Sequence, residues 1–200
     1  GSHGRATLPA MPIEQTSIDG LLVVRWDTHD DDRGFFRQTY QVRELDDALG
    51  RPVTFRQGNH SHSVPGVLRG FHAEPWDKCV YVVRGLAMAA IADIRPDSPT
   101  FGAVETFTLG SPPDGERIRL FISEGLANSF VTLGEERTDY LYDVSGYWQP
   151  GITQPAVIWN DPDLGVDWPL EDPILSDKDQ ENPTLRELFP DHPKWAGEQS

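Results

Sequence analysis

Residues 79–94 read CVYVVRGLAMAAIADI, two apolar runs that meet at Arg84 and Gly85. Short runs of apolar and β-branched residues are typical of strands, and a glycine between two such runs is a common turn signal. The segment therefore predicts a β-hairpin with one strand at 79–85 and the other at 86–94.

Further short strands are expected on both sides of this segment, at 21–26, 35–40, 53–57, 67–72, 104–109, 117–122, 129–133, 138–144 and 156–159. Turn clusters rich in proline and aspartate, such as residues 95–99, separate several of them. One short helix is expected at 42–49, because the Gly50 that follows it is a typical helix stop signal. Many short strands at such regular spacing predict an all-β sandwich or barrel.

Composition narrows the class of protein. The chain has 200 residues, of which 38% are hydrophobic, and this suits one domain with a substantial core. Its net charge of −15 makes nucleic acid and anionic membranes poor partners, although a few local cations could hold a small anion. The single cysteine, Cys79, excludes an intramolecular disulfide and suits a reducing compartment. No apolar run approaches the roughly 18 residues that span a membrane, so we expect a cytoplasmic protein.

A few side chains could carry chemistry. His72 ends an expected strand and is a candidate general base, because an imidazole titrates near neutral pH. On a regular strand Arg69 and His72 would point to opposite faces, unless Gly70 kinks the chain. Tyr142 lies on another strand, where its phenol could deliver a proton or simply pack in the core. Asp179 lies in a polar stretch, where an acidic side chain is usually just solvated.

Several segments together resemble the dTDP-4-dehydrorhamnose 3,5-epimerase family. They follow the order and spacing of the family and read DRGFF at 32–36, QGNHS at 57–61, GVLRGFH at 66–72, DIRPDSPTFG at 93–102, WNDP at 159–162 and LSDKD at 175–179. The resemblance implies a cupin (jelly-roll) β-barrel with short peripheral helices, a homodimer, and catalysis without a metal or other cofactor. It also implies one epimerase domain at 12–185, followed by a C-terminal tail at 186–200. The residues Gly1-Ser2-His3 are typical of an expression tag, so we expect a tag and tail at 1–11.

The resemblance further implies a reaction and roles for particular residues. The family inverts carbon centres beside the C4 ketone of a nucleotide-linked sugar, so the expected ligand is a dTDP-linked 4-keto-6-deoxyhexose. His72 matches the base, Asp179 its partner in a dyad, and Tyr142 the acid. Lys78 would stabilise the enolate that forms when a proton leaves the carbon beside the ketone. The expected substrate-binding residues are Arg33, Gln57, Asn59, Arg69, Asn128 and Lys178.

Three departures from the family leave the outcome of the reaction open, and one of them is that Thr153 and Gln154 stand where the family has an acid. Asn128 stands where the family has a histidine, and Gln38 stands near the position of an acid. Both fall among expected substrate contacts, so the chain could invert C3 and C5 or only one of these centres. Two further functions fit the same motifs: a cupin ketoisomerase, which moves the carbonyl group, and a non-catalytic nucleotide-sugar binding protein.

His60 and His62 are two positions apart, so on a strand they would share one face and could bind one metal ion. A metal centre of the cupin type would also use a glutamate a few residues later and a further histidine. Glu74 lies too far along the chain, and Asn128 stands at the position of the last histidine. We therefore expect no such metal centre and interpret the two histidines as surface or loop residues.

Overall fold

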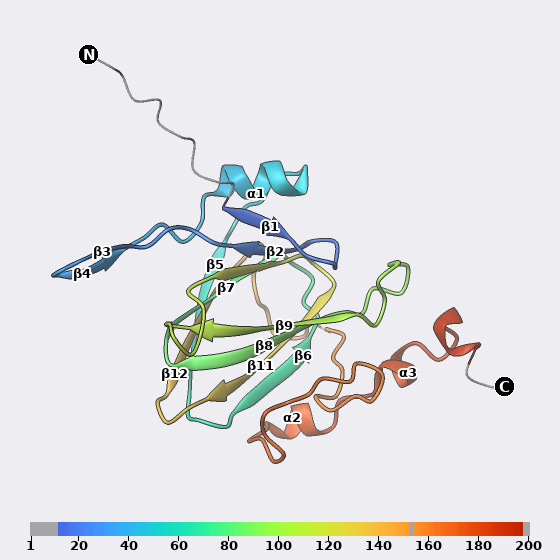
Figure 1. Cartoon of the computed structure of the whole chain (residues 1–200). Coiled ribbons are helices and arrows are strands. Elements are labelled where there is room, and N and C mark those ends of the chain that lie inside the picture. The colour runs from blue at the N-terminus through green and yellow to red at the C-terminus, as the bar shows by residue number, and fades with distance from the viewer. Residues whose placement is uncertain (1–11, 153, 198–200) are drawn as a thin grey trace.

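The computed structural model describes residues 12–152 and 154–197 and contains two antiparallel sheets that face each other across a core (Figure 1). The larger sheet has six strands in the order β1 (Ile13–Gln15), β2 (Leu21–Val24), β10 (Arg119–Ile122), β7 (Lys78–Arg84), β12 (Thr138–Val144) and β5 (Gln57–Ser63). The smaller sheet has four strands in the order β6 (Leu68–His72), β11 (Leu126–Leu133), β8 (Leu86–Asp93) and β9 (Val104–Gly110). The arrangement confirms the expected all-β barrel.

The hairpin predicted at 79–94 is wrong, although both of its strands form. β7 pairs with β10 and β12, whereas β8 pairs with β11 and β9, so the chain passes from one sheet to the other at Gly85. Gly85 has a φ of +79°, and a Cβ atom there would lie 2.7 Å from the carbonyl oxygen of Arg137. Glycine is therefore needed at this crossing, but it is needed equally in hairpin turns, and the pattern alone cannot separate the two.

The main core lies between the two sheets and includes Val80, Ile91, Leu120 and Tyr140. A separate cluster covers the outer face of the larger sheet, where Leu45 of helix α1 (Val42–Leu49) packs among buried strand residues. The helix has the predicted limits. Both faces of the larger sheet are thus partly covered, which is why its central strands are largely buried.

Among the other strand predictions, three differ most from the structure. The strand expected at 53–57 begins later, as β5, and the one expected at 35–40 shortens to β4 (Gly34–Phe36). The stretch 156–159 forms only an isolated bridge between Ala156 and His72. The position of β5 was predicted wrongly because its sequence, QGNHSHS, has no alternation of apolar and polar residues that would indicate a strand.

Strands β3 (His29–Asp31) and β4 form a two-stranded hairpin that projects away from the barrel (Figure 1). Its apolar side chains are unusually open to solvent, with Phe35 51% and Phe36 70% exposed. Arg33 lies in the turn of this hairpin, and its side chain is 90% exposed.

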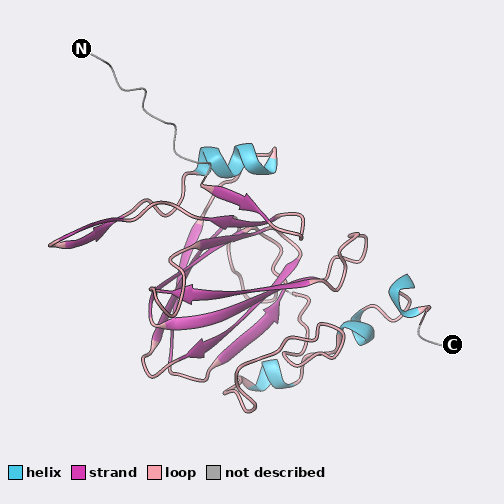
Figure 2. Cartoon of the chain, in the orientation of Figure 1, coloured by secondary structure: helices cyan, strands magenta, loops and turns pink. Residues whose placement is uncertain are grey.

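The C-terminal segment runs along β6 and carries the short helices α2 (Asp177–Gln180) and α3 (Leu185–Leu188) and a 3₁₀ turn at Pro193–Trp195 (Figure 2). Trp195 is 6% exposed and packs in a cluster with Phe101 and Leu185. Residues up to Trp195 therefore belong to the folded domain, which corrects the tail expected at 186–200. The tag and tail expected at 1–11 lie outside the described residues. None of the helices described is long and apolar enough to cross a membrane.

Candidate active site

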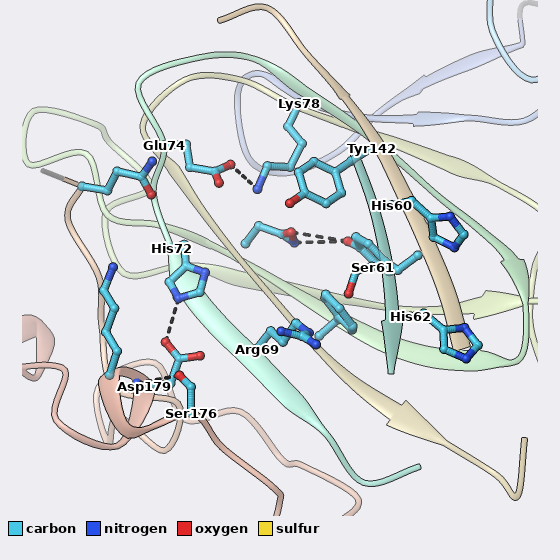
Figure 3. Close-up of a pocket in the computed structure, with 15 residues that line it drawn as sticks. His60, Ser61, His62, Arg69, His72, Glu74, Lys78, Tyr142, Ser176 and Asp179 are labelled. Atoms are coloured by element: carbon cyan, nitrogen blue, oxygen red, sulfur yellow. Dashed lines mark hydrogen bonds and ion pairs between the residues drawn. The ribbon is translucent and has the colours of Figure 1, made fainter. Parts of the chain in front are cut away.

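A cavity of about 510 Å³ lies between the two sheets on the side of the C-terminal segment (Figure 3). Strands of both sheets and helix α2 contribute to its walls. Seven of the expected catalytic and substrate-binding residues line it, namely Arg69, His72, Lys78, Asn128, Tyr142, Lys178 and Asp179. The cavity is therefore the candidate active site.

A β-bulge in β6 brings Arg69 and His72 to the same side of the strand. Their partners on β11 are two positions apart, whereas Arg69 and His72 are three positions apart, so β6 carries one extra residue. Gly70, inside the bulge, has a φ of +117°, and a Cβ atom there would lie 2.5 Å from the carbonyl oxygen of Asn128. Arg69 and His72 can act together only if the strand is kinked at Gly70, and this kink is present. Only glycine fits the position.

His72 and Asp179 form a hydrogen-bonded pair at one wall of the cavity. His72 Nε2 lies 2.7 Å from Asp179 Oδ1, and the Asp179 side chain is 5% exposed. Asp179 also accepts hydrogen bonds from the Gly70 amide and from Asn182 Nδ2, both at 3.3 Å. The Asp179 amide donates to Ser176 Oγ, which caps α2 and holds the carboxylate in place.

These contacts decide the charge of Asp179. Burial alone would raise the pKa of its carboxyl group, but the hydrogen bonds from His72, Gly70 and Asn182 outweigh burial and lower the pKa below its ordinary value. An ionised Asp179 accepts the proton on His72 Nε2. The lone pair of the neutral imidazole is then on Nδ1, which becomes the atom able to take a proton from a ligand.

Tyr142 of β12 and Lys78 of β7 lie next to each other on the opposite wall, and Figure 3 shows them across the cavity from His72. Lys78 Nζ lies 4.9 Å from the centre of the Tyr142 ring and forms an ion pair with Glu74. Burial, and then the negative charge of Glu74, raise the pKa of Tyr142 above its ordinary value. The phenol therefore keeps its proton at neutral pH and can act as a donor.

Asn128 is buried in the wall of the cavity and makes a neutral contact. Its Nδ2 lies 3.3 Å from the hydroxyl oxygen of Tyr140, whose ring stacks on Phe130 with the ring centres 3.9 Å apart. A histidine at this position could carry a positive charge, whereas asparagine cannot. The departure seen in the sequence thus removes a titratable group from the cavity.

Three expected substrate contacts do not line the cavity. Gln57 and Asn59 lie on the less exposed face of β5 and bind each other, with Gln57 Nε2 donating to Asn59 Oδ1 at 2.8 Å. Gln57 Oε1 also accepts from the Trp148 amide at 3.2 Å. Arg33 pairs with Asp31 in the projecting hairpin, so the structure does not bring it to the cavity of its own chain.

Sequence reasoning missed other side chains that shape the site. Glu74, considered above only as a metal ligand, pairs with Lys78 inside the cavity. Ser63 Oγ accepts hydrogen bonds from Arg69 Nε and Nη2, and Asn182 supports Asp179. Only Glu74 had a sequence signal, because it precedes Lys78 by four residues.

His60 and His62 lie at the edge of the cavity on the exposed face of β5, whereas Ser61 between them belongs to the less exposed face (Figure 3). Their side chains are 57% and 45% exposed and both contact Asp139. A metal centre of the cupin type inside the barrel therefore does not include them.

The barrel and its cavity define a cupin-fold enzyme that holds a His–Asp pair opposite a tyrosine. Comparison with known proteins agrees. Residues 15–187 match the family model described as dTDP-4-dehydrorhamnose 3,5-epimerase. The chain is 40% identical over 176 residues to the dTDP-4-dehydrorhamnose 3,5-epimerase of Pseudomonas aeruginosa, covering 86% of this chain and 94% of the relative. It is 35% identical over 181 residues to the dTDP-4-dehydrorhamnose 3-epimerase of Streptomyces niveus, covering 88% and 85%.

The solved structures show the same relationship. The crystal structure of NovW, a 4-keto-6-deoxy sugar epimerase from the novobiocin biosynthetic gene cluster of Streptomyces spheroides, matches with a TM-score of 0.82 and 32% identity, covering 98% of this chain and 96% of that one. The chain belongs to the dTDP-4-dehydrorhamnose 3,5-epimerase family and is an isomerase. The cupin jelly-roll fold implied by the sequence motifs is thereby confirmed.

Proposed function

We propose that this enzyme epimerises a dTDP-linked 4-keto-6-deoxyhexose by removing a proton from a carbon beside the ketone and returning one to the opposite face. The observation that carries the proposal is the placement of the His72–Asp179 pair across one cavity from Tyr142 (Figure 3). A base and an acid on opposite walls are the minimum needed to invert a carbon centre.

The proposed reaction has two proton transfers. His72 Nδ1 takes the proton from C3 or C5, and the electrons of the broken C–H bond move toward the C4 oxygen to give an enolate. Asp179 stabilises the imidazolium that results. Lys78 lines the same cavity, and its proposed role is to stabilise the enolate oxygen with its ammonium group. Tyr142 then donates its proton to the carbon from the other side, the carbonyl re-forms, and the configuration is inverted.

Local cations support binding of an anionic substrate by a chain of net charge −15. Arg69 and Lys178 line the cavity, and a guanidinium group suits the oxygens of a diphosphate. Gln57 and Asn59 lie on the less exposed face of β5, and we propose that they exchange their mutual hydrogen bond for bonds to the nucleotide. We propose that Asn128, which lines the cavity, contacts the sugar.

We also propose a homodimer and a cytoplasmic location. The hairpin that carries Arg33 exposes Phe35 and Phe36, and such apolar surface is typical of a protein interface. Packing of the hairpin on a second copy would let Arg33 reach a substrate in the partner's cavity, which its own cavity does not permit. A chain with one buried cysteine suits a reducing compartment.

Inversion at only one of the two centres is the second candidate. It is favoured by Asn128, whose buried neutral contact with Tyr140 replaces the histidine of the family motif. The lost group could otherwise orient the sugar for the second proton transfer. A relative named as a 3-epimerase and one named as a 3,5-epimerase are both similar to this chain, so family membership leaves the choice open.

The test is incubation with dTDP-4-keto-6-deoxyglucose in deuterated water, followed by NMR of the sugar. Deuterium at both C3 and C5 with an L-configured product is the result expected for a 3,5-epimerase. Deuterium at one carbon would identify the monofunctional enzyme. A carbonyl that has moved to C3 would mean a ketoisomerase, and no incorporation by folded protein would contradict the proposal.

A further inference from the structure

His60, His62 and Asp139 form a cluster on the exposed face of the larger sheet. β5 is the edge strand of this sheet and pairs with β12, where Asp139 lies directly opposite His62. His60 is two residues from His62 on the same face. The carboxylate that the sequence pattern did not supply near the two histidines thus comes from the neighbouring strand.

The imidazole rings of His60 and His62 both contact one carboxylate oxygen of Asp139. Asp139 Oδ1 lies 2.8 Å from His60 Nε2 and 2.6 Å from His62 Nδ1, and the three atoms all lie within 4.8 Å of one another. We propose that His60, His62 and Asp139 bind one divalent transition-metal ion of the zinc type. None of the three residues takes part in the proton transfers proposed for the cavity.

The spacing of the three atoms suits such an ion. Zinc binds imidazole nitrogen and carboxylate oxygen at about 2.0–2.2 Å, so two ligands of a tetrahedral site are roughly 3.3 Å apart. The contacts to Asp139, now 2.8 and 2.6 Å, need to widen by roughly 0.5 and 0.7 Å to reach that spacing. Both imidazoles are about half exposed, so they can make this movement, and the remaining coordination positions of the ion face solvent.

The chemistry of the three groups selects the class of metal. Neutral imidazoles are good ligands for Zn²⁺ and Co²⁺ but poor ones for Ca²⁺ and Mg²⁺, which prefer oxygen. Each ring must offer an unprotonated nitrogen to the ion, so the metal takes the place of the hydrogen bonds that join the two rings to Asp139.

Metal binding here would join the edge strand β5 to β12 across their exposed face. β5 is a polar strand with few apolar contacts of its own, and an ion held by both strands would stabilise the folded state by mass action. The proposed metal site would therefore be structural and would link the two strands.

The experiment is a titration of the full chain with Co²⁺, followed by visible absorption, and with Zn²⁺, followed by the melting temperature. The parent protein and every variant in this experiment carry His3→Ala, because a histidine near the N-terminus could bind the same ions. The test variants are His62→Gln and Asp139→Asn, and the matched control is His29→Gln, an exposed histidine on the projecting hairpin. None of these three positions is fully buried, so folding is expected to be retained.

We expect one Co²⁺ per chain with the d–d absorption of a nitrogen–oxygen site, and a rise in melting temperature with Zn²⁺. His62→Gln and Asp139→Asn should each weaken binding about 100-fold, whereas His29→Gln should bind as the parent does. Binding that is equally strong in His62→Gln would overturn the proposal. So would a parent protein that shows neither the absorption bands nor a shift in melting temperature.

Discussion

The protein contains two histidine–aspartate clusters whose hydrogen bonds are almost alike. In the cavity His72 lies 2.7 Å from Asp179, and on the exposed face of the sheet His60 and His62 lie 2.8 and 2.6 Å from Asp139. Their surroundings differ. The imidazole is 30% exposed in the cavity, but 57% and 45% exposed in the other cluster. The length of a hydrogen bond therefore says little about what a histidine does.

The two clusters differ in the hydrogen bonds that each aspartate makes besides the one to its first histidine. Asp179 is fixed by the Gly70 amide and Asn182, so His72 is held in one orientation toward a ligand space that ends at Tyr142. In the exposed cluster both rings bind the same oxygen and face solvent. The first arrangement orients one base, while the second gathers several ligands around one point.

Replacing one histidine of each cluster should give the largest difference in activity between the two clusters. Because a positioned general base contributes about 10²–10⁴-fold to a rate, His72→Gln should lower kcat by about 10³-fold. His62→Gln should leave kcat unchanged. Steady-state turnover of dTDP-4-keto-6-deoxyglucose measures both. Equal losses in the two variants would mean that the cavity does not distinguish the two histidines.

The acid on the opposite wall should have a smaller effect. Tyr142→Phe removes the proton donor but keeps the ring that packs beside Lys78, so kcat should fall about 100-fold while the fold is retained. Circular dichroism is the control for folding. Full activity in Tyr142→Phe would assign the donor role to another group or to water.

The two aspartates should differ in how they link stability to acid pH. The pKa of Asp179 is lowered in the folded protein, so its ionised form stabilises the fold above the ordinary aspartate pKa of about 3.9, and this contribution is lost as the pH falls below that value. The melting temperature of the parent should therefore fall toward that of Asp179→Asn as the pH drops from neutral through that value. The pKa of Asp139 is also lowered, but Asp139→Asn should show a smaller version of this trend because its partners are exposed. A larger effect at Asp139 would reverse the comparison.

The smallest expected effect is at Glu74. Its charge helps to raise the pKa of Tyr142, so Glu74→Gln should lower that pKa and the proton donor should be lost at a lower pH. The alkaline limb of the pH profile of kcat should therefore move to lower pH. Glu135→Gln, an exposed glutamate away from this cavity, is the matched control. An unmoved limb would mean that Glu74 does not influence the donor.

Much of the fold could be predicted from apolar runs, because buried strands such as β7, β8 and β11 carry that pattern. What the pattern could not provide was the partner of each strand, and so the 79–94 hairpin was wrong. β5 was displaced because its alternating faces carry only polar and glycine residues, which leaves it without an apolar pattern.

The candidate site was predictable wherever a short motif carried it. His72 and Asp179 came from motifs in distant parts of the chain, and the structure brings them into contact. The sequence did not predict the bulge at Gly70 directly. It showed only that a kink there was needed for Arg69 and His72 to share one face. Asp139 was missed because its role depends on a cross-strand neighbour, which leaves no local signal. Glu74 was missed because its four-residue spacing from Lys78 indicates a pair only when the loop between them folds back.

The most direct test of the central claim, that His72 removes the carbon-bound proton, is the exchange of deuterium from solvent into the sugar by His72→Gln and Tyr142→Phe. Tyr142→Phe should still exchange deuterium into the sugar, although its turnover to the inverted product is slow. His72→Gln should show no exchange above the rate without enzyme. Exchange by His72→Gln at the rate of the parent would contradict the assignment of the base.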